Sequence, residues 1–167
     1  MYNELTEIDI RKMREEIEHI NREIRPKCVA DLQTARAFGD LSENYEYKAA
    51  KQELRRCDSR LRYLKKMIET AKIVRPDASA SGVKLFDEVD VYFVDDDEVE
   101  TFRIVTTLRE NALSGIISNV SPMGRALLGR NKGDRVRVKV SDKVEYDVII
   151  RDIRPGTDDD TLPIRSF

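Results

Sequence analysis

Apolar residues in the first half of the chain recur at helical spacing. From Leu5 to about Phe38 they return every three or four positions with charged residues between them, which predicts a long amphipathic helix. Pro26 interrupts this stretch, and we expect a kink there because proline donates no backbone hydrogen bond. From Tyr47 to Ala71 the spacing alternates strictly between three and four, which predicts a second helix with a coiled-coil seam.

Gly39 stands between the two patterns. Glycine commonly ends a helix because it adopts the left-handed conformation without strain. The long second seam needs a partner, and the first helix is the nearest one. Residues 1–75 are therefore predicted to form an antiparallel coiled-coil hairpin with its tip at 39–46. Roughly thirty residues per arm, at a rise of 1.5 Å each, give a hairpin about 45–50 Å long.

The hydrophobic period changes to two after a linker of small and polar residues at 76–82. Beyond the linker, the segment from Ser121 to Gly129 is predicted to be a short helix, with Ser121 as its cap and Pro122 at its first position. The predicted fold class is α+β, with a small antiparallel β domain at 83–153 and an extension at 154–167 for which no structure is predicted. The predicted strands are 89–94, 99–105, 116–117, 136–140 and 144–150.

Composition excludes several classes of function. The net charge of −2 means that basic residues do not outnumber acidic ones over the chain as a whole. No apolar run approaches the roughly 20 residues that span a bilayer. A cytoplasmic protein without a signal segment or a membrane partner is therefore expected. The single histidine, His19, excludes a Ser-His-Asp triad, and Cys28 and Cys57 add no zinc constellation. The two thiols are predicted to lie about 9 Å apart along the hairpin, beyond disulfide reach.

Two carboxylates, Asp40 and Glu43, stand at the predicted tip. Their spacing fits a capping box at the start of the second helix, where the helix dipole also favours acidic residues. Ser42 could provide the cap instead and leave Asp40 free. An acidic pair at the end of a long arm also suits the delivery of acid groups to a site elsewhere, so the residues alone leave both interpretations open.

The run from Gly39 to Tyr47, GDLSENYEY, resembles the signature Gly-Asp-Leu-x-Glu-Asn-x-Glu-Tyr of bacterial GreA/GreB transcript cleavage factors. The resemblance extends over roughly residues 4–150. It implies a C-terminal domain of FKBP-like fold that docks at the rim of the secondary channel of bacterial RNA polymerase, while the coiled coil enters the channel. Further segments that resemble the family, in its order, are Leu5-Thr6, Arg25-Pro26, Ala71–Val74, Ile117-Ser118 and Ser121–Gly129.

What the resemblance implies about function is specific. Asp40 and Glu43 would be the catalytic acids, holding the second Mg²⁺ of the polymerase and orienting water at the backtracked 3′ end of the nascent RNA. The protein would then complete the active site of the polymerase without being an enzyme, and no cofactor or small-molecule substrate is expected on the isolated monomer. Residues implied to support the tip are Gly39, Ser42, Asn44 and Tyr45, and those implied to dock on the polymerase are Ser121, Pro122, Met123 and Arg125.

Two other functions compete with transcript cleavage. One is a channel-binding regulator of the same fold that inhibits the polymerase without promoting cleavage. The other is a plain coiled-coil interaction protein, which would leave the acidic tip unexplained. The GreA-like or GreB-like subtype also stays open from the sequence.

The second predicted helix carries a basic stripe beside its seam. A charge run of this kind is usually a solvated face, but in a channel that holds extruded RNA, contact with phosphates is expected. The chain departs from the family pattern at Tyr45, where a small residue is common, and at Asp9, where glycine is frequent and no functional consequence is expected. The basic stripe consists of Lys48, Lys51, Arg55, Arg62 and Lys65.

Overall fold

The computed structural model describes residues 3–39 and 44–165. Contacts divide the chain into two compact units. The first contains Ile10–Ala71, and the second contains Lys72–Ser166 together with Asn3–Asp9. In the described residues, no helix combines the length and the apolar character that crossing a membrane requires.

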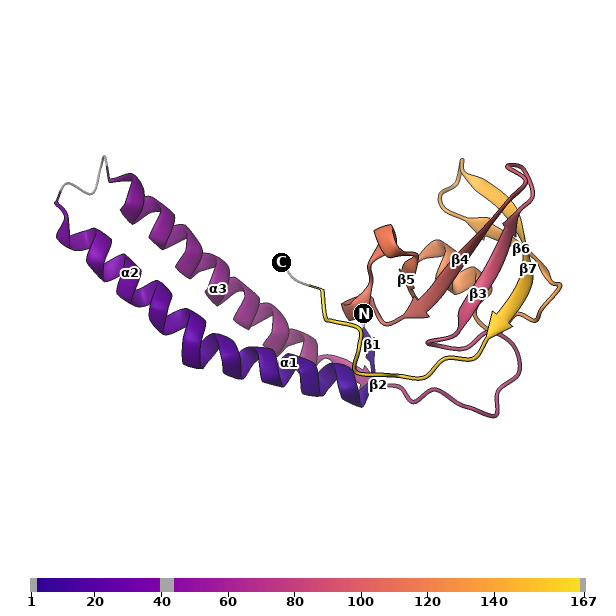
Figure 1. Ribbon diagram of the computed structural model, residues 1–167, viewed down its shortest axis with the longest axis horizontal. Coiled ribbons are helices and arrows are strands. Elements are labelled where there is room, and N and C mark those ends of the chain that lie inside the picture. The colour runs from indigo at the N-terminus through magenta and orange to yellow at the C-terminus, as the bar shows by residue number, and fades with distance from the viewer. Residues whose placement is uncertain (1–2, 40–43, 166–167) are drawn as a thin grey trace. The chain divides into compact units, whose positions relative to one another are not determined.

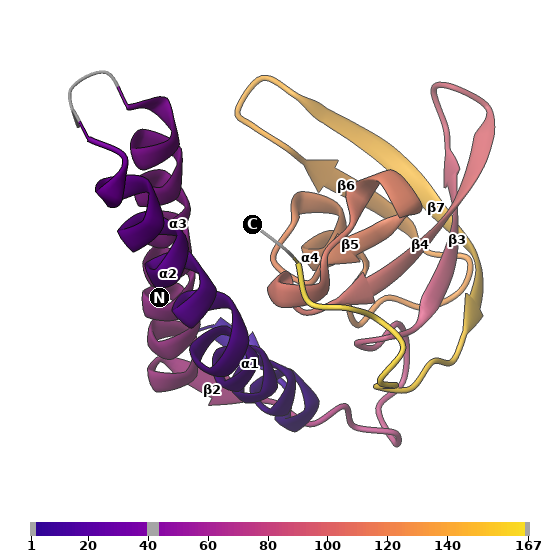
Figure 2. The ribbon, with the colours of Figure 1, turned by 60° about the vertical axis from the view of Figure 1, so that its left-hand side comes forward.

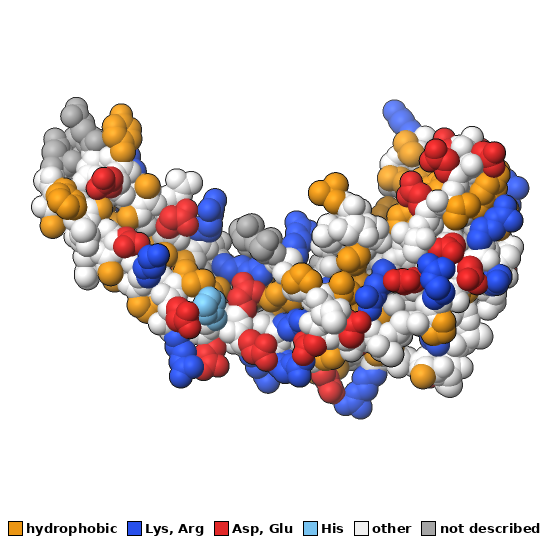
Figure 3. Space-filling view, in the orientation of Figure 1, with side chains coloured by type: hydrophobic (Ala, Val, Ile, Leu, Met, Phe, Trp, Pro, Cys, Tyr) orange, Lys and Arg blue, Asp and Glu red, His pale blue; other side chains and the backbone are white. Residues whose placement is uncertain are grey.

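The first unit is the predicted helical hairpin, in which α2 runs beside α3 (Figure 1). Its helices are α1 (Glu7–His19), the π-helix η1 (Ile20–Ile24), α2 (Arg25–Ala37) and α3 (Tyr45–Glu69). Apolar side chains from both arms are buried along the seam, while charged side chains of both signs cover the face of the hairpin seen in Figure 3. The buried seam residues are Ile10, Met13, Ile20 and Ala35 from the first arm and Cys57, Leu61, Leu64 and Met67 from α3.

The irregularity at Pro26 differs from a simple kink in one helix. Pro26 lies in the first turn of α2, which follows the preceding helical turn without a break, and it donates no backbone hydrogen bond to that turn. The preceding turn widens into η1, and the N–H of Arg25 reaches back to the carbonyl of Ile20. The segment predicted to be one kinked helix is therefore three consecutive helical segments, and the π-helical one lies directly before the turn that contains Pro26.

Ion pairs reinforce the contact between the arms. Arg60 is bidentate to Glu16, with Nε–Oε1 and Nη2–Oε2 distances of 2.6 and 2.9 Å. Arg25 on α2 contacts Asp58 on α3, with an Nε–Oδ1 distance of 2.9 Å. Both cysteines are free thiols, and burial raises the pKa of the Cys57 thiol.

The second unit contains a five-stranded sheet in the order β5-β4-β3-β7-β6. Four of these strands are antiparallel to their neighbours, as predicted, but β5 pairs with β4 in parallel. The link between β4 and β5 contains the 3₁₀ turns η2 (Thr107–Arg109) and η3 (Ala112–Ser114). This link brings the chain back so that β5 runs in the same direction as β4. The strands are β3 (Glu88–Phe93), β4 (Glu98–Val105), β5 (Ile116–Ser118), β6 (Arg135–Lys139) and β7 (Glu145–Arg154).

The predicted short helix is α4 (Pro122–Leu127), which packs against one face of the sheet (Figure 2). Ser121 caps it by accepting a hydrogen bond of 3.0 Å from the N–H of Gly124. A Cβ atom at Gly124 would lie 2.1 Å from the carbonyl oxygen of Ser118, so only glycine allows this close packing. Met123 and Leu127 join the strand residues Val89 to Ile150 in one hydrophobic core.

A two-stranded sheet was not predicted. It pairs β1 (Asn3–Leu5) with β2 (Ala71–Ile73), and the N–H of Val74 donates to the carbonyl of Leu5 at 2.9 Å. The sequence pattern assigned Leu5 and Ala71 to helices, because short apolar segments at helix ends carry no period of their own.

One carboxylate links three strands of the large sheet. Asp90 on β3 accepts hydrogen bonds from Thr101 on β4 at 2.7 Å and from Arg154 on β7 at 2.8 and 2.9 Å. The bonds from Arg154, followed by the bond from Thr101, lower the pKa of Asp90 to about 2.

This lowered pKa predicts a defined acid sensitivity. The contribution of Asp90 to stability is complete above about pH 4, its unfolded pKa, and is lost as the pH falls toward about 2. Asp90→Asn should melt earlier than wild type at neutral pH, and the difference should shrink between pH 4 and 2 in thermal denaturation. The exposed Asp96→Asn variant is the control, and a constant difference for Asp90→Asn over this range would refute the assignment.

Candidate functional site

Asn44 organises the described residues next to the tip of the hairpin. Its Oδ1 accepts a hydrogen bond of 2.9 Å from the N–H of Tyr47, which makes it the N-cap of α3. Its Nδ2 donates at 2.8 Å to the carbonyl of Ala35, one of the last carbonyls of α2. Gly39 has φ of +112°, in the positive-φ region that favours glycine after a helix end. Asn44 therefore connects the two helix ends through one side chain.

This arrangement changes the interpretation of the acidic pair. The first turn of α3 begins at Tyr45, after the segment in which a capping box was predicted. Asp40, Ser42 and Glu43 lie outside the described residues. Because Asn44 already supplies the cap, α3 does not require Asp40 or Ser42 for this purpose.

Aromatic and basic side chains gather at this end of the hairpin. Phe38 and Tyr45 are exposed by 73 and 82%, so neither stabilises the hairpin through burial. The ammonium groups of Lys48 and Lys51 lie 5.6 and 5.8 Å from the ring centroids of Tyr45 and Tyr47. The exposure of Phe38 was not predicted, although an aromatic residue stands directly before Gly39 in the sequence.

All five residues of the basic stripe are exposed on α3. Within the described chain, no ion pair involves any of them, whereas Arg56 on another side of the same helix contacts Glu53 at 3.2 Å. The stripe thus offers its positive charges to an external anion.

The residues expected to dock on the polymerase divide into two groups. Pro122 and Arg125 are exposed on α4, and Ser121 is partly exposed while its hydroxyl caps the helix. Met123 is only 8% exposed and belongs to the hydrophobic core. Met123 lies on the side of α4 that faces the sheet, so its side chain packs in the core and is not exposed for docking.

Metal-binding side chains do not cluster in residues 3–39 and 44–165. No three His, Cys, Asp or Glu side chains there come together in a way that would hold a metal ion. This finding does not cover Asp40 and Glu43, whose metal-binding role remains a prediction.

Two family models match the chain. The model "Transcription elongation factor, N-terminal" matches residues 3–73, and "Transcription elongation factor, GreA/GreB, C-term" matches residues 68–155. The chain belongs to the GreA/GreB family of transcription elongation factors. The resemblance seen at the tip and in α4 is thereby confirmed over most of the chain.

Individual relatives agree with the family. The transcription elongation factor GreA of Mesomycoplasma hyopneumoniae (strain 7448) is 36% identical over 145 residues, which cover 87% of this chain and 91% of the relative. GreA of Leuconostoc citreum (strain KM20) is 41% identical over 140 residues, or 83% of this chain and 88% of the relative. Among solved structures, GreA factor homolog 1 of Thermus thermophilus is 25% identical with a TM-score of 0.43, covering 93% of this chain and 100% of that one.

The capping role of Asn44 is testable by substitution. Asn44→Ala should lower the free energy of unfolding of the hairpin by about 1–2 kcal/mol, because one cap and the bond to Ala35 are lost. Ser42→Ala should leave it unchanged. Denaturation followed by circular dichroism at 222 nm measures both. An equal loss in Ser42→Ala would show that Ser42 shares the cap.

Proposed function

We propose that this elongation factor stimulates the cleavage of backtracked RNA by RNA polymerase, and that Asp40 and Glu43 are the groups it contributes. Family membership establishes that the protein is a transcription elongation factor acting on RNA polymerase. The cleavage activity and the roles of the two acids are the proposal.

The observation that carries this proposal is the cap made by Asn44. A carboxylate pair before a helix is ordinarily explained by capping and by the helix dipole. Here Asn44 accepts from the N–H of Tyr47 and donates to the carbonyl of Ala35, so the N-cap position of α3 is filled by a residue other than the two acids. Asp40 and Glu43 are then available for chemistry with a partner.

The donor chemistry fits the proposal. Carboxylate oxygens are hard ligands that suit Mg²⁺, and such an ion, when bound, would supply Lewis-acid polarisation of a phosphodiester and lower the pKa of water. Two carboxylates leave most of an octahedral shell unfilled. The remaining ligands would have to come from the polymerase and its RNA, which explains why the protein alone would not be an enzyme.

The hairpin is suited to present the two acids at a distance. The 25 residues of α3 extend about 37 Å at 1.5 Å per residue. The apolar seam and the bidentate Arg60–Glu16 pair hold the arms together away from the tip. We further propose that the basic stripe contacts phosphates of extruded RNA, and that Ser121, Pro122 and Arg125 dock at the rim of the channel.

Removing one acid charge at a time tests the chemistry. Asp40→Asn and Glu43→Gln should each reduce RNA cleavage in a stalled, backtracked complex by on the order of 100-fold, because an amide is a poor ligand for a hard cation. Binding to the polymerase and the melting temperature should stay close to wild type, as in the control variant Glu53→Gln.

Two results would contradict this account. If the variants melt earlier and lose binding together with activity, the acids act as caps. If the wild-type protein binds the complex and suppresses cleavage, the protein is the inhibitory regulator of the same fold.

The basic stripe predicts a dependence on RNA length. Replacing both Arg55 and Arg62 with Gln should slow cleavage of long extruded RNA more than cleavage after a backtrack of one or two nucleotides, because only a longer strand reaches these charges. The difference should shrink in high salt, which screens the phosphate contacts. Arg56→Gln is the matched control. Equal loss on both substrates would indicate contacts with the polymerase instead.

A further inference from the structure

Arg109, which ends η2, is a buried charge held by residues from both ends of the chain. Its side chain is 0% exposed, and its Nε lies 2.6 Å from Oδ1 of Asp9. On the other side, Nη1 lies 2.6 Å from Oδ1 of Asp158, an ion pair without a well-aligned hydrogen bond, and donates to the carbonyl of Asp159 at 3.1 Å. Nη2 donates to the hydroxyl of Thr6 at 3.1 Å. All these residues belong to the second unit.

Asp9 serves two partners at once. Its Oδ2 accepts from the N–H of Thr6 at 3.0 Å, while its own N–H donates to the Thr6 hydroxyl at 3.3 Å, a reciprocal capping box at the start of α1. Its Oδ1 faces Arg109. Asp9 therefore has a structural role that was not predicted, because this carboxylate both caps α1 and neutralises a buried guanidinium.

Besides the contact of Asp158, several other hydrogen bonds attach the C-terminal extension to the second unit. The N–H of Gly156 donates to Asp87 at 3.0 Å, Arg103 donates to the carbonyl of Thr157 at 3.2 Å, and the N–H of Arg165 donates to the carbonyl of Leu108 at 2.7 Å. A Cβ atom at Gly156 would lie 1.9 Å from the carbonyl oxygen of Phe86, so the chain passes closer to the backbone there than any other residue allows.

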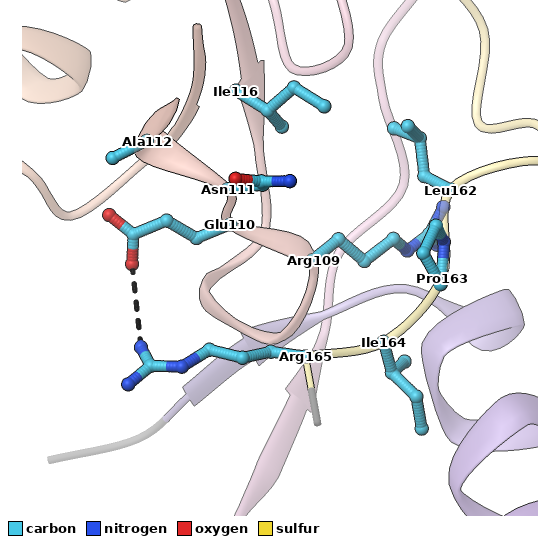
Figure 4. A pocket seen from close by; sticks show the side chains of 9 residues that line it. All are labelled: Arg109, Glu110, Asn111, Ala112, Ile116, Leu162, Pro163, Ile164 and Arg165. Atoms are coloured by element: carbon cyan, nitrogen blue, oxygen red, sulfur yellow. Dashed lines mark ion pairs between the residues drawn. The ribbon is translucent and has the colours of Figure 1, made fainter. Parts of the chain in front are cut away.

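Figure 4 shows the extension from Leu162 to Arg165 lying opposite the segment from Arg109 to Ile116. The two segments line an open pocket of about 540 Å³. The ion pair of Arg165 with Glu110, at 3.9 Å, connects its two sides. The extension thus lies against the segment that carries Arg109.

The cluster depends on both carboxylates. Burial alone would lower the pKa of Arg109, but the close contacts with Asp158 and Asp9 outweigh it and raise the pKa above its ordinary value. Breaking a buried ion pair by removing one partner is costly because the remaining charge is left uncompensated. Loss of Asp158 should therefore weaken the whole cluster, including the contacts of Thr6 and Asp9.

We propose that residues 156–165 form an intramolecular strap, which completes the Arg109 cluster and thereby holds the segment Asn3–Asp9 in place within the second unit. The family model matches the chain up to residue 155, so the strap lies beyond the matched residues. It couples the two ends of the chain through one arginine. The strap requires no assumption about RNA cleavage.

Amide hydrogen exchange measured by NMR on the full chain tests this coupling. In Asp158→Asn, exchange at Gly156 and Arg165 should accelerate roughly 10- to 100-fold, as loss of one charge-assisted contact implies. Exchange at Thr6 and Asp9 should accelerate by a similar factor. Asp96→Asn, an exposed aspartate of the same unit, should change neither.

The reciprocal variant sharpens the test. Asp9→Asn should accelerate exchange at Gly156 and Arg165, although these residues are distant from it in sequence. The proposal is overturned if Asp158→Asn releases Gly156 and Arg165 without affecting Thr6 and Asp9, or if it affects neither pair. Equal acceleration in β3 and β7 would also overturn it, since the effect would then be global. A chain that ends at Pro155, as the family match does, should show the same local loss at Thr6 and Asp9.

Discussion

The seam between the two arms of the hairpin is the interaction on which the presentation of the tip depends. It buries a limited set of apolar side chains, of which each Leu, Ile or Met contributes about 1.5–3 kcal/mol at most, and Ala35 is the buried member nearest the tip. Stability is thus generated along the arms, while Phe38 and Tyr45 at the far end stay exposed. Among the described residues there, the Asn44 side chain joins the two helix ends.

Charge has two separate uses in this molecule. Inside, Arg60 and Arg109 are buried and paired with carboxylates, so their contribution is to fix the packing of the elements they connect. Outside, the stripe on α3 has no partner among the described carboxylates and is available to anions. The net charge of −2 conceals this division, because a local field depends on where charges lie and not on their total.

Much of the fold could be predicted from the sequence because hydrophobic period reports burial directly. The hairpin, the cap of α4 by Ser121 and most of the strands follow from spacing and turn residues. The π-helical turn before Pro26 could not be predicted, since the same period fits a kinked α-helix. The parallel pairing of β5 was also inaccessible, because direction depends on how the link between β4 and β5 folds.

The candidate site was predictable in part. The family motif singled out Asp40 and Glu43 as candidates, but it could not show that Asn44 caps α3, because Asp40, Ser42 and Asn44 are all good capping residues. The cluster around Arg109 was missed for a different reason. Asp9, Arg109 and Asp158 are about 50 to 150 positions apart in the sequence, and no local pattern connects them.

The central claim is that the tip acids help bind a cation that the polymerase holds poorly by itself. The most direct measurement is the Mg²⁺ concentration required for half-maximal cleavage of backtracked RNA, with and without the wild-type protein. The account predicts that the protein shifts this requirement to lower Mg²⁺ and shortens the RNA. An unchanged Mg²⁺ requirement, or no shortened RNA at any concentration of the protein, would contradict it.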